Sequence, residues 1–305
     1  MGVTRPVIGF VGFGEAARCF TRHLVGQGVP EVLVFCGGGT NHPPYTAAFR
    51  DQAAEHGATL VDTQAELVQR CDVVFSAVVV STAARVGADI AGQLRPGTLV
   101  VDVNASTPST KRAIAEAVIS RGGAYVDANL MGAVSIYGAT VALYCSGDGA
   151  ERFAADFAPL GLSIELAGPV AGTAAAVKML RSVVTKGIEA LVIEALTAAS
   201  LAGVREAAMR GICGPMDATP FSTFVDMCIR TDVLHAERRA VEMEGVAEGI
   251  RELGLSAVMT EAAAARLHAS AALGLREDFA KTAQYTADQV LDAYAARSRQ
   301  ARQTG

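Results

Sequence analysis

A stripe of polar side chains on one face of a predicted helix offers groups that can transfer a proton. The alanine-rich pattern over residues 172–203 predicts one long helix, interrupted only by Gly187. At about 100° per residue, side chains three, four, seven, eight and eleven positions beyond Lys178 share its face. A lysine acts as a general acid or base when burial or a cationic neighbour lowers its pKa toward neutrality. The stripe consists of Lys178, Arg181, Ser182, Thr185, Lys186 and Glu189.

Residue types within the stripe suggest separate roles. Arg181 is a cationic neighbour of the kind that can lower the lysine pKa, and its guanidinium can also pair with a carboxylate through two hydrogen bonds. Ser182, one turn beyond the lysine, can orient a substrate or relay a proton. We therefore take Lys178 and Ser182 as candidate catalytic residues and Arg181 as a candidate substrate ligand. Two alternatives stay open: Arg181 forms a salt bridge with Glu189 or with a neighbouring helix, or the whole stripe is a solvent-exposed face.

The position of this helix favours the functional interpretation. It follows the last strand of a nucleotide-binding pattern, so we expect it to border a cleft between two domains. Its other side is apolar, as a helix that packs against further structure requires. That apolar side carries Met179, Leu180, Val183, Val184 and Leu191.

A glycine-rich turn near the start of the chain predicts a dinucleotide site. The apolar run Val7–Val11 leads into a G-x-G-x-x-A turn at residues 12–17, and a helical pattern continues to Gly28. The first glycine permits a tight turn, the second lets a pyrophosphate approach the backbone, and the helix N-terminus offers N–H groups. Because strand, spacing and helix agree, we expect a dinucleotide rather than a tight turn without a ligand. The predicted contacts are Gly12, Phe13, Gly14, Glu15 and Ala16.

The end of the second predicted strand, Glu31–Phe35, is where such a site distinguishes NAD from NADP. A carboxylate there holds the ribose hydroxyls and repels a 2′-phosphate, and residues 36–42 contain none. They offer backbone N–H groups and small side chains that can cradle a phosphate, so we expect NADP to be preferred over NAD. The alternative is that the glycines only permit a long turn, with Arg50 too distant to help. The predicted contacts are Gly37, Gly38 and Thr40.

Two further loops are expected at the same edge of the sheet, where parallel strands end. The strand pattern within residues 72–80 brings Val78 and Val79 beside the cofactor. The strand Thr98–Asp102 leads to Asn104, which we place near the nicotinamide. A turn residue that bonds its own backbone explains an asparagine at this position equally well.

A loop after the predicted strand Ala124–Asn129 has small residues that leave its backbone accessible. Glycine and alanine let a small anionic ligand approach the backbone N–H groups. The sequence therefore predicts that this loop can bind a small anionic ligand at Gly132 and Ala133.

The order of strand and helix patterns predicts the fold class. Strands alternate with helices over residues 1 to about 165, which indicates an α/β fold with a doubly wound parallel sheet of Rossmann type. The pattern changes at Gly168-Pro169, after which only helices and short loops are predicted. We expect a dinucleotide-binding domain over residues 1–167 and an all-helical substrate and dimerisation domain over residues 168–305.

Two helix caps are predicted from sequence signals. Ser106 or Thr107 precedes a helical pattern that follows Pro108, and either hydroxyl can accept an N–H of the first turn. In the tail, Thr286 and Gln289 have the spacing of a capping box at the start of the last helix.

Composition and charge exclude several classes of function. The chain has 305 residues, 51% of them apolar, and a formal net charge of −5. No apolar run has the length of a membrane span, and no signal peptide is recognisable at the N-terminus, so we expect a cytoplasmic protein without a membrane partner. Charges of both signs are interspersed, which argues against nucleic acid as a partner. The six cysteines lack metal-ligand spacing, so we predict reduced thiols and no metal.

Four motifs occur in one order and resemble the β-hydroxyacid dehydrogenase family, which includes 3-hydroxyisobutyrate dehydrogenase and 6-phosphogluconate dehydrogenase. The resemblance extends over residues 7 to about 190. The motifs are the turn at residues 12–17, the Asp102-x-Asn104-x-x-x-Pro108 loop, the Gly132-Ala133 loop and Gly172-Thr173-x-x-x-x-Lys178.

The resemblance implies roles for two of these motifs. In that family the lysine matching Lys178 is the general acid and base at the substrate hydroxyl, and the loop matching Met131-Gly132-Ala133 holds the substrate carboxylate. Members dimerise, so we expect a homodimer or a higher homo-oligomer. The chain departs from the usual pattern at three places, which leave the substrate open: Ser182 replaces asparagine, Met131-Gly132-Ala133 replaces Ser-Gly-Gly, and Ala77-Val78-Val79 replaces Met-Leu-Pro.

We therefore expect an NADP-preferring dehydrogenase or reductase that acts on a β-hydroxy acid or a related small hydroxy or carbonyl compound. One alternative is an imine reductase of the same architecture, against which Lys178 counts because those enzymes usually lack the lysine. The other is a non-catalytic protein that binds NADPH and reports the redox state to a partner.

Overall fold

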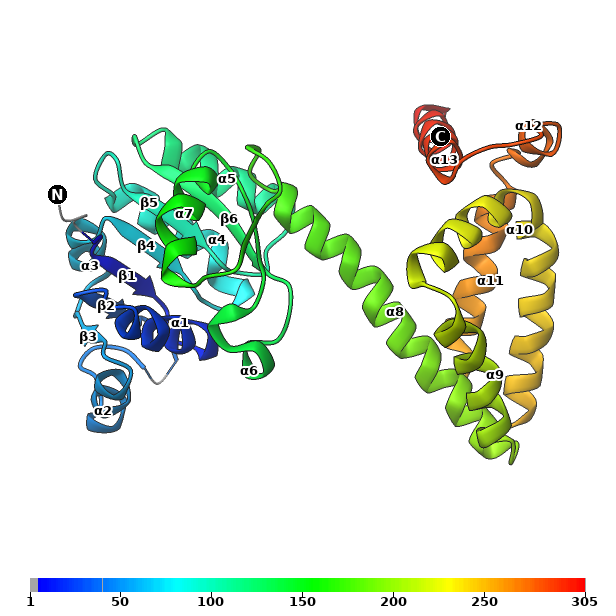
Figure 1. Ribbon diagram of the computed structural model, residues 1–305, viewed down its shortest axis with the longest axis horizontal. Helices are drawn as coiled ribbons and strands as arrows, with labels where there is room; N and C mark the ends of the chain where they lie inside the picture. Colours follow the sequence, from blue (N-terminus) through cyan, green and yellow to red (C-terminus); the bar gives the residue numbers. More distant parts are fainter. Residues whose placement is uncertain (1–4, 40, 305) are drawn as a thin grey trace. The chain divides into compact units, whose positions relative to one another are not determined.

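The chain divides into two compact units, residues 1–183 and 184–305, in a computed structural model that describes residues 5–39 and 41–304 (Figure 1). The division falls within one long helix, α8 (Thr173–Leu201), whose first turns therefore belong to the first unit. The boundary predicted from composition, between residues 167 and 168, precedes this helix and stays a prediction. Each unit is described separately below.

The first unit is built on an eight-stranded sheet with the order β3-β2-β1-β4-β5-β6-β7-β8. Apolar runs bounded by turns form most of these strands, as expected for strands that are covered on both faces. The predicted doubly wound sheet is confirmed. The strands are β1 (Ile8–Val11), β2 (Val32–Phe35), β3 (Thr59–Leu60), β4 (Val73–Ser76), β5 (Leu99–Asp102), β6 (Ala124–Leu130), β7 (Leu143–Ser146) and β8 (Ile164–Leu166).

The sheet is mostly parallel, with one reversal. β6 and β7 pair antiparallel, while β7 and β8 pair parallel with each other. The connection between β6 and β7 holds only the short helix α6 (Val134–Tyr137) and the 3₁₀ turn η1 (Gly138–Thr140). A parallel neighbour needs a longer crossover, usually with a full helix, so the chain returns in the opposite direction.

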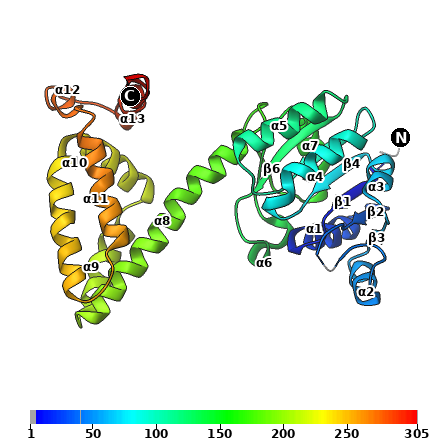
Figure 2. The ribbon, with the colours of Figure 1, turned by 180° about the vertical axis from the view of Figure 1, so that it is seen from behind.

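Helices cover both faces of this sheet (Figures 1 and 2). The core on one side joins the sheet to α1, α2 and α7, and the core on the other side joins it to α3, α4 and α5. A 3₁₀ turn, η2 (Ala158–Leu160), follows α7. The helices are α1 (Glu15–Gly26), α2 (Ala47–Glu55), α3 (Gln64–Arg70), α4 (Val80–Gln93), α5 (Pro108–Ile119) and α7 (Ala150–Phe157).

Aromatic packing forms the centre of the first core. Phe75 on β4 is 1% exposed and stacks on Phe10 of β1 with ring centroids 4.7 Å apart. Phe153 and Phe157 of α7 approach the same ring edge-on, at 5.9 and 5.7 Å. Such contacts add to the burial of large apolar surfaces, so they fix α7 on the sheet.

One row of residues runs across five strands at the edge where β1, β4 and β5 end. Backbone pairing aligns Val11 with Ser76, Ser76 with Asp102, Asp102 with Asp127, and Asp127 with Ser146. The glycine turn follows directly after Val11. The predicted cofactor edge therefore carries a line of buried polar side chains.

Threonine caps start three helices of this unit. Thr107 accepts the N–H of Thr110, which confirms the predicted cap, and Pro108 occupies the first turn of α5. Thr46 and Thr63 cap α2 and α3 in the same way. Each cap accepts an N–H that has no partner within its helix.

The second unit contains the last part of α8 and five more helices, and none of its described residues lies in a strand. Glu194 of α8 accepts the backbone N–H groups of Met259 and Thr260 at the start of α11, at 2.7 and 2.9 Å. The predicted capping box is confirmed, because Thr286 and Gln289 bond each other's backbone N–H. The five helices are α9 (Arg205–Ala218), α10 (Phe221–Glu252), α11 (Val258–Ala271), α12 (Arg276–Ala280) and α13 (Ala287–Thr304).

No helix in the described part of the chain combines the length and the apolar character that crossing a bilayer requires.

Truncating the central aromatic ring tests the packing of the first unit. Phe75→Ala leaves a cavity among Phe10, Phe153 and Phe157, so we expect the free energy of unfolding to fall by about 3–5 kcal/mol in urea titrations followed by circular dichroism. Ile119→Ala is the control, because Ile119 is 49% exposed. We expect that change to cost less than about 1 kcal/mol. Equal costs for the two variants would contradict the assignment of the core.

Candidate functional site

The glycine turn has a shape that fits a pyrophosphate. Gly12 adopts φ +95°, and a Cβ atom there would lie 2.2 Å from the carbonyl oxygen of Ala77, so only glycine is accommodated. Gly14 caps α1 without a side-chain hydrogen bond, and a Cβ on it would meet no atom within 4 Å. Space is therefore open beside Gly14 at the positive end of the α1 dipole, where the first-turn N–H groups have no partner within the helix.

The side chain of Phe13 anchors the turn in the core. It is 6% exposed and packs edge-on against Phe49 and His56 of the adjoining α2 segment. Glu15 and Ala16 begin the helix after the turn. The five residues predicted to contact the cofactor thus form one continuous strand-turn-helix unit.

The loop after β2 is exposed and lacks a carboxylate. Gly37 and Gly38 are exposed, and Gly38 forms a single bridge with Asn41. The hydroxyl of Tyr45 donates to the carbonyl of Val61 at 2.8 Å and accepts the N–H of Cys36 at 3.2 Å, which ties the loop to its surroundings. Thr40, the third predicted contact, lies outside the described residues.

Arg50 has a backbone partner. It lies on α2, exposed, and its Nε donates to the carbonyl of Tyr45 at 3.2 Å. One N–H of the guanidinium is thus used near the start of the helix.

Asn104 links two strand ends. Its side chain is buried, its Oδ1 accepts the N–H of Val78 at 2.7 Å, and its Nδ2 donates to Ser76 and Asp102 at 2.9 and 2.7 Å. Val79 is 67% exposed at the start of α4. Asn104 therefore holds the β4 loop at the cofactor edge, and its predicted proximity to the nicotinamide stays a prediction.

The loop after β6 is accessible at its small residues. Gly132 and Ala133 are exposed, and Met131 is half-buried. The N–H of Met131 donates to the carbonyl of Ala142 at 2.8 Å, so that donor serves the chain itself. The accessible backbone of this loop is therefore at residues 132 and 133.

The first turns of α8 are attached to the sheet by hydrogen bonds to their N–H groups. Asp127 Oδ2 accepts the N–H of Gly172 and of Ala175, at 3.1 and 2.9 Å, and Ser146 Oγ accepts that of Ala174 at 3.0 Å. Both acceptors belong to the row of polar residues described above. Lys178 lies one turn beyond Ala175 and is half-buried.

Ser182 and Arg181, two other members of the α8 stripe, differ in their burial and in their surroundings. Ser182 is half-buried and donates its hydroxyl hydrogen to the carbonyl of Lys178 at 2.9 Å, so it presents lone pairs rather than a proton. A hydrogen bond to Glu165 raises the pKa of Tyr144, and the positive charge of Arg181 acts on that pKa in the opposite direction. Arg181 is therefore near β7 and β8, and it is exposed.

The apolar side of α8 is exposed in the single chain. Met179, Leu180 and Val183 have exposed fractions of 49%, 61% and 67%. Lys178 and Ser182 are more buried than these apolar neighbours, so the polar stripe is not a solvent-exposed face throughout.

A buried ionic cluster at the cofactor edge was not predicted from the sequence. Lys111 of α5 is fully buried, and its Nζ lies 2.8 Å from the carbonyl of Asp102, 3.1 Å from Asp102 Oδ1 and 3.2 Å from Asp127 Oδ1. The signal in the sequence is that Lys111 shares a helical face with Ile114, Ala115 and Val118, all buried. A lysine on an apolar helix face requires buried partners for its charge.

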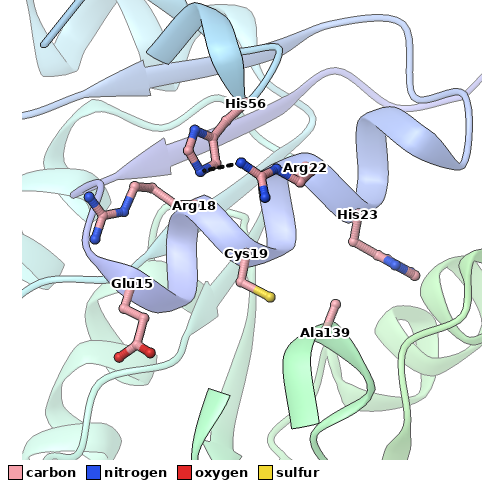
Figure 3. Close-up of a pocket in the computed structure, with 7 residues that line it drawn as sticks. All are labelled: Glu15, Arg18, Cys19, Arg22, His23, His56 and Ala139. Carbon is pink, nitrogen blue, oxygen red and sulfur yellow. Dashed lines mark hydrogen bonds between the residues drawn. The ribbon is translucent and has the colours of Figure 1, made fainter. Parts of the chain in front are cut away.

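A separate cavity of about 540 Å³ lies along α1 (Figure 3). Glu15 is the one predicted site residue that lines it. Arg22 donates to His56 Nε2 at 3.3 Å, and His56 Nδ1 donates to the carbonyl of Gln52 at 2.8 Å. Arg22 and His56 are thus hydrogen-bonded to each other across this lining. The lining residues are Glu15, Arg18, Cys19, Arg22, His23, His56 and Ala139.

The cysteines are free thiols, as predicted. Burial raises the pKa of Cys36 to about 11 and the pKa values of Cys71 and Cys145 to about 12. These three side chains are buried, and the other three are half-buried. Among the described residues, no group of three or more histidine, cysteine, aspartate or glutamate side chains has the arrangement of a metal site.

The sheet, the glycine turn and the polar row at the ends of the strands define a dinucleotide-binding protein of the Rossmann class. Residues 7–156 match the NAD binding domain of 6-phosphogluconate dehydrogenase, and residues 199–270 match a domain of unknown function, DUF1932. The chain belongs to this 6-phosphogluconate dehydrogenase-like family, in agreement with the order of its motifs. This membership supports NAD(P)-dependent oxidoreduction as its chemistry.

Two solved structures resemble nearly the whole chain. A conserved hypothetical protein from Sinorhizobium meliloti is 30% identical, covers 95% of this chain and is itself covered to 96%, with a TM-score of 0.60. A conserved protein of unknown function, described as structurally similar to 3-hydroxyacid dehydrogenases, is 29% identical with coverages of 87% and 97% and a TM-score of 0.60.

Further matches include proteins with other descriptions. An imine reductase from Myxococcus stipitatus, in complex with NAD⁺, has a TM-score of 0.74 at 18% identity, with coverages of 91% and 100%, which shows a shared fold. The cytokine-like nuclear factor N-PAC from Xenopus tropicalis is 29% identical over 207 residues. That match covers 66% of this chain and 37% of the length of N-PAC.

Adding a methyl group at Gly14 tests the pyrophosphate site. In Gly14→Ala the new Cβ contacts nothing within the chain, so we expect the free energy of unfolding to change by less than about 1 kcal/mol. The methyl group occupies the space through which a pyrophosphate reaches the backbone. Affinity for NADPH, measured by fluorescence titration, should therefore fall by about tenfold or more.

Gly26→Ala is the matched control at the other end of α1. A Cβ at this position also meets no atom within 4 Å, and its φ is not positive. We expect its affinity for NADPH to equal that of the unmodified chain. Equal affinities for the unmodified chain and both variants would refute the assignment of the pyrophosphate to this turn.

Proposed function

We propose that this chain is an NADP-preferring oxidoreductase that transfers hydride between the nicotinamide and a β-hydroxy acid or a related hydroxy or carbonyl compound. Lys178 is the general acid and base in this proposal. The observation that carries it is the attachment of α8 to the row of residues at which the dinucleotide turn begins. The helix that bears Lys178 thus starts at the cofactor edge.

Lys178 has the chemistry that the reaction needs from the protein. The nicotinamide, when bound, accepts a hydride from the carbinol carbon or returns one to a carbonyl carbon. As hydride leaves the carbon, the hydroxyl proton passes to the neutral amine of Lys178, and in the reverse direction the ammonium returns it. Lys178 is half-buried, and the positively charged Arg181 lies three residues further along the same helix. Burial and a neighbouring positive charge both favour the neutral amine of a lysine.

The remaining predicted contacts divide between the two ligands. Gly12, Gly14 and the first turn of α1 hold the pyrophosphate, and Gly37 and Gly38 cradle the 2′-phosphate in a loop without a carboxylate. The accessible backbone at Gly132 and Ala133 binds the substrate carboxylate. Arg181 pairs with that carboxylate, and Ser182 accepts a hydrogen bond from the substrate.

Support for a hydroxy compound comes from the family and from the relative described as similar to 3-hydroxyacid dehydrogenases. Imine reduction is the second candidate, because the fold is shared with imine reductases at a TM-score of 0.74. A non-catalytic NADPH-binding role is the third, because this chain is also similar to a protein named as a nuclear factor. Turnover of oxo acids, ketones or cyclic imines with NADPH distinguishes the three.

The proposal includes a cytoplasmic homodimer or higher homo-oligomer. Large apolar side chains along α8 are exposed in the single chain, which is typical of surfaces that associate. Light scattering after size exclusion measures the oligomeric state directly.

Removing the amine of Lys178 tests the mechanism. Lys178→Ala deletes the acid and base but leaves the glycine turn intact. We expect kcat to fall by about 100- to 10,000-fold on the best substrate of the panel, with unchanged affinity for NADPH. Lys186→Ala is the control, since Lys186 is exposed on the same predicted stripe, and its kcat should be unchanged. Full activity of Lys178→Ala would refute the mechanism.

A carboxylate introduced into the β2 loop tests the preference for NADP. In Gly38→Asp the side chain enters open space, and its charge repels a 2′-phosphate. A repulsion of about 1–4 kcal/mol at close range lowers affinity for NADPH about fivefold or more, whereas affinity for NADH changes less. Gly38→Ala, which adds no charge, should keep the preference for NADPH. The idea fails if Gly38→Asp leaves the ratio of the two dissociation constants unchanged.

A further inference from the structure

The ammonium group of Lys111 is saturated by two acidic residues from neighbouring strands. A lysine has three N–H donors, and three oxygens of Asp102 and Asp127 lie within 3.2 Å of its Nζ. All three side chains are 0–1% exposed. One ammonium therefore faces two carboxylates in a space that water does not enter.

Asp102 connects this cluster to the loop at the cofactor edge. Its Oδ1 accepts both the backbone N–H and the side-chain amide of Asn104, at 2.9 and 2.7 Å. Asn104 in turn holds the N–H of Val78. The second oxygen, Oδ2, accepts the hydroxyl of Tyr125 at 2.8 Å. The position of the β4 and β5 loops thus depends on where Asp102 is held.

Asp127 connects the same cluster to the helix that bears Lys178. Its Oδ1 faces Lys111 and accepts the side chain of Asn129 at 2.7 Å. Its Oδ2 accepts the N–H groups of Gly172 and Ala175 and the hydroxyl of Ser146. One carboxylate therefore bonds the lysine on one side and the first turn of α8 on the other.

We propose that Lys111 and Asp127 are positioning residues that tie the Asn104 loop and the first turn of α8 into one rigid assembly, which fixes the spacing between the nicotinamide side of the sheet and Lys178. The role of Lys178 rests on the proposed function. The mechanical link between the two segments does not, because it follows from the hydrogen bonds alone.

The net charge of the cluster makes it depend on α8 as much as α8 depends on it. Two carboxylates against one ammonium leave one excess negative charge, and the N-terminus of α8 supplies compensating partial positive charge and N–H donors. Detaching α8 would leave Asp127 without two of its donors in a buried site. The cluster and the attachment of α8 therefore depend on each other. A buried ion pair by itself adds little net stability over apolar side chains.

Asp127→Asn tests the positioning role, because it removes the charge and keeps the shape. A shift of about 1 Å in a reacting group lowers turnover by about 100-fold, so we expect a loss of that size in kcat. KM and affinity for NADPH should stay at their unmodified values. Asp148→Asn is the matched control: Asp148 accepts the N–H of Tyr125 in the same strand at 3.0 Å but lies outside the cluster and is exposed.

Ser146→Ala is a second, milder variant for the case that Asp127→Asn does not fold. It removes one oxygen that bonds the N–H of Ala174 and the carboxylate of Asp127, and the smaller side chain fits the same space. We expect kcat to fall by about tenfold with unchanged KM. Unchanged kcat in this variant, or a kcat that falls only in proportion to the folded fraction, overturns the proposal.

Hydrogen exchange separates this proposal from the proposed function. If the unmodified chain turns over no substrate, the proposed function fails, and exchange in the two variants decides the remaining question. Faster exchange in residues 102–107 and 172–178 together, with β1 and β2 unchanged, supports the link. A change confined to residues 172–178, or spread evenly over the first unit, refutes it.

Discussion

A positive charge without access to water governs the architecture of the cofactor edge. An isolated buried ammonium costs several kcal/mol, so Lys111 on the inner face of α5 requires acceptors, and strands β5 and β6 supply them at matching positions in the sheet. Once Asp102 and Asp127 are committed to Lys111, their remaining lone pairs need donors too. Asn104, Tyr125, Ser146 and the start of α8 provide these donors. The loops at this edge are therefore placed by hydrogen-bond demand as much as by apolar packing.

Steric restriction shapes the other half of the edge. The turn after β1 passes so close to the β4 loop that a single added carbon at Gly12 would overlap a carbonyl oxygen. The same β4 loop is held from its other side by Asn104. The dinucleotide turn and the polar cluster thus meet at residues 77 and 78. A fold of this class leaves its chemistry to loops at the carboxyl ends of strands, and here those loops are braced against one another.

Local signals in the sequence were sufficient for much of this arrangement. The apolar runs, the glycine turn, the cap at Thr107 and the capping box at Thr286 depend on neighbours within a few residues, and each was predicted correctly. The buried cluster escaped prediction because Lys111, Asp102 and Asp127 meet only after three elements have packed. The reversal at β7 escaped for a similar reason, since strand patterns carry no direction. Asn104 shows the intermediate case: its place at the strand end followed from the pattern, whereas its bonds to Ser76 and Val78 depend on the neighbouring strand β4 and the loop after it.

The three buried thiols place natural probes on opposite faces of the sheet. Cys36 and Cys145 belong to the core beneath α1 and α7, and Cys71 belongs to the core beneath α3 and α4. Burial raises the pKa of each of these thiols, so they stay in the neutral form, which reacts slowly with electrophiles. Alkylating reagents therefore label these sulfurs only when a layer of helices detaches. The pattern of labelled cysteines reports which face of the sheet opens first.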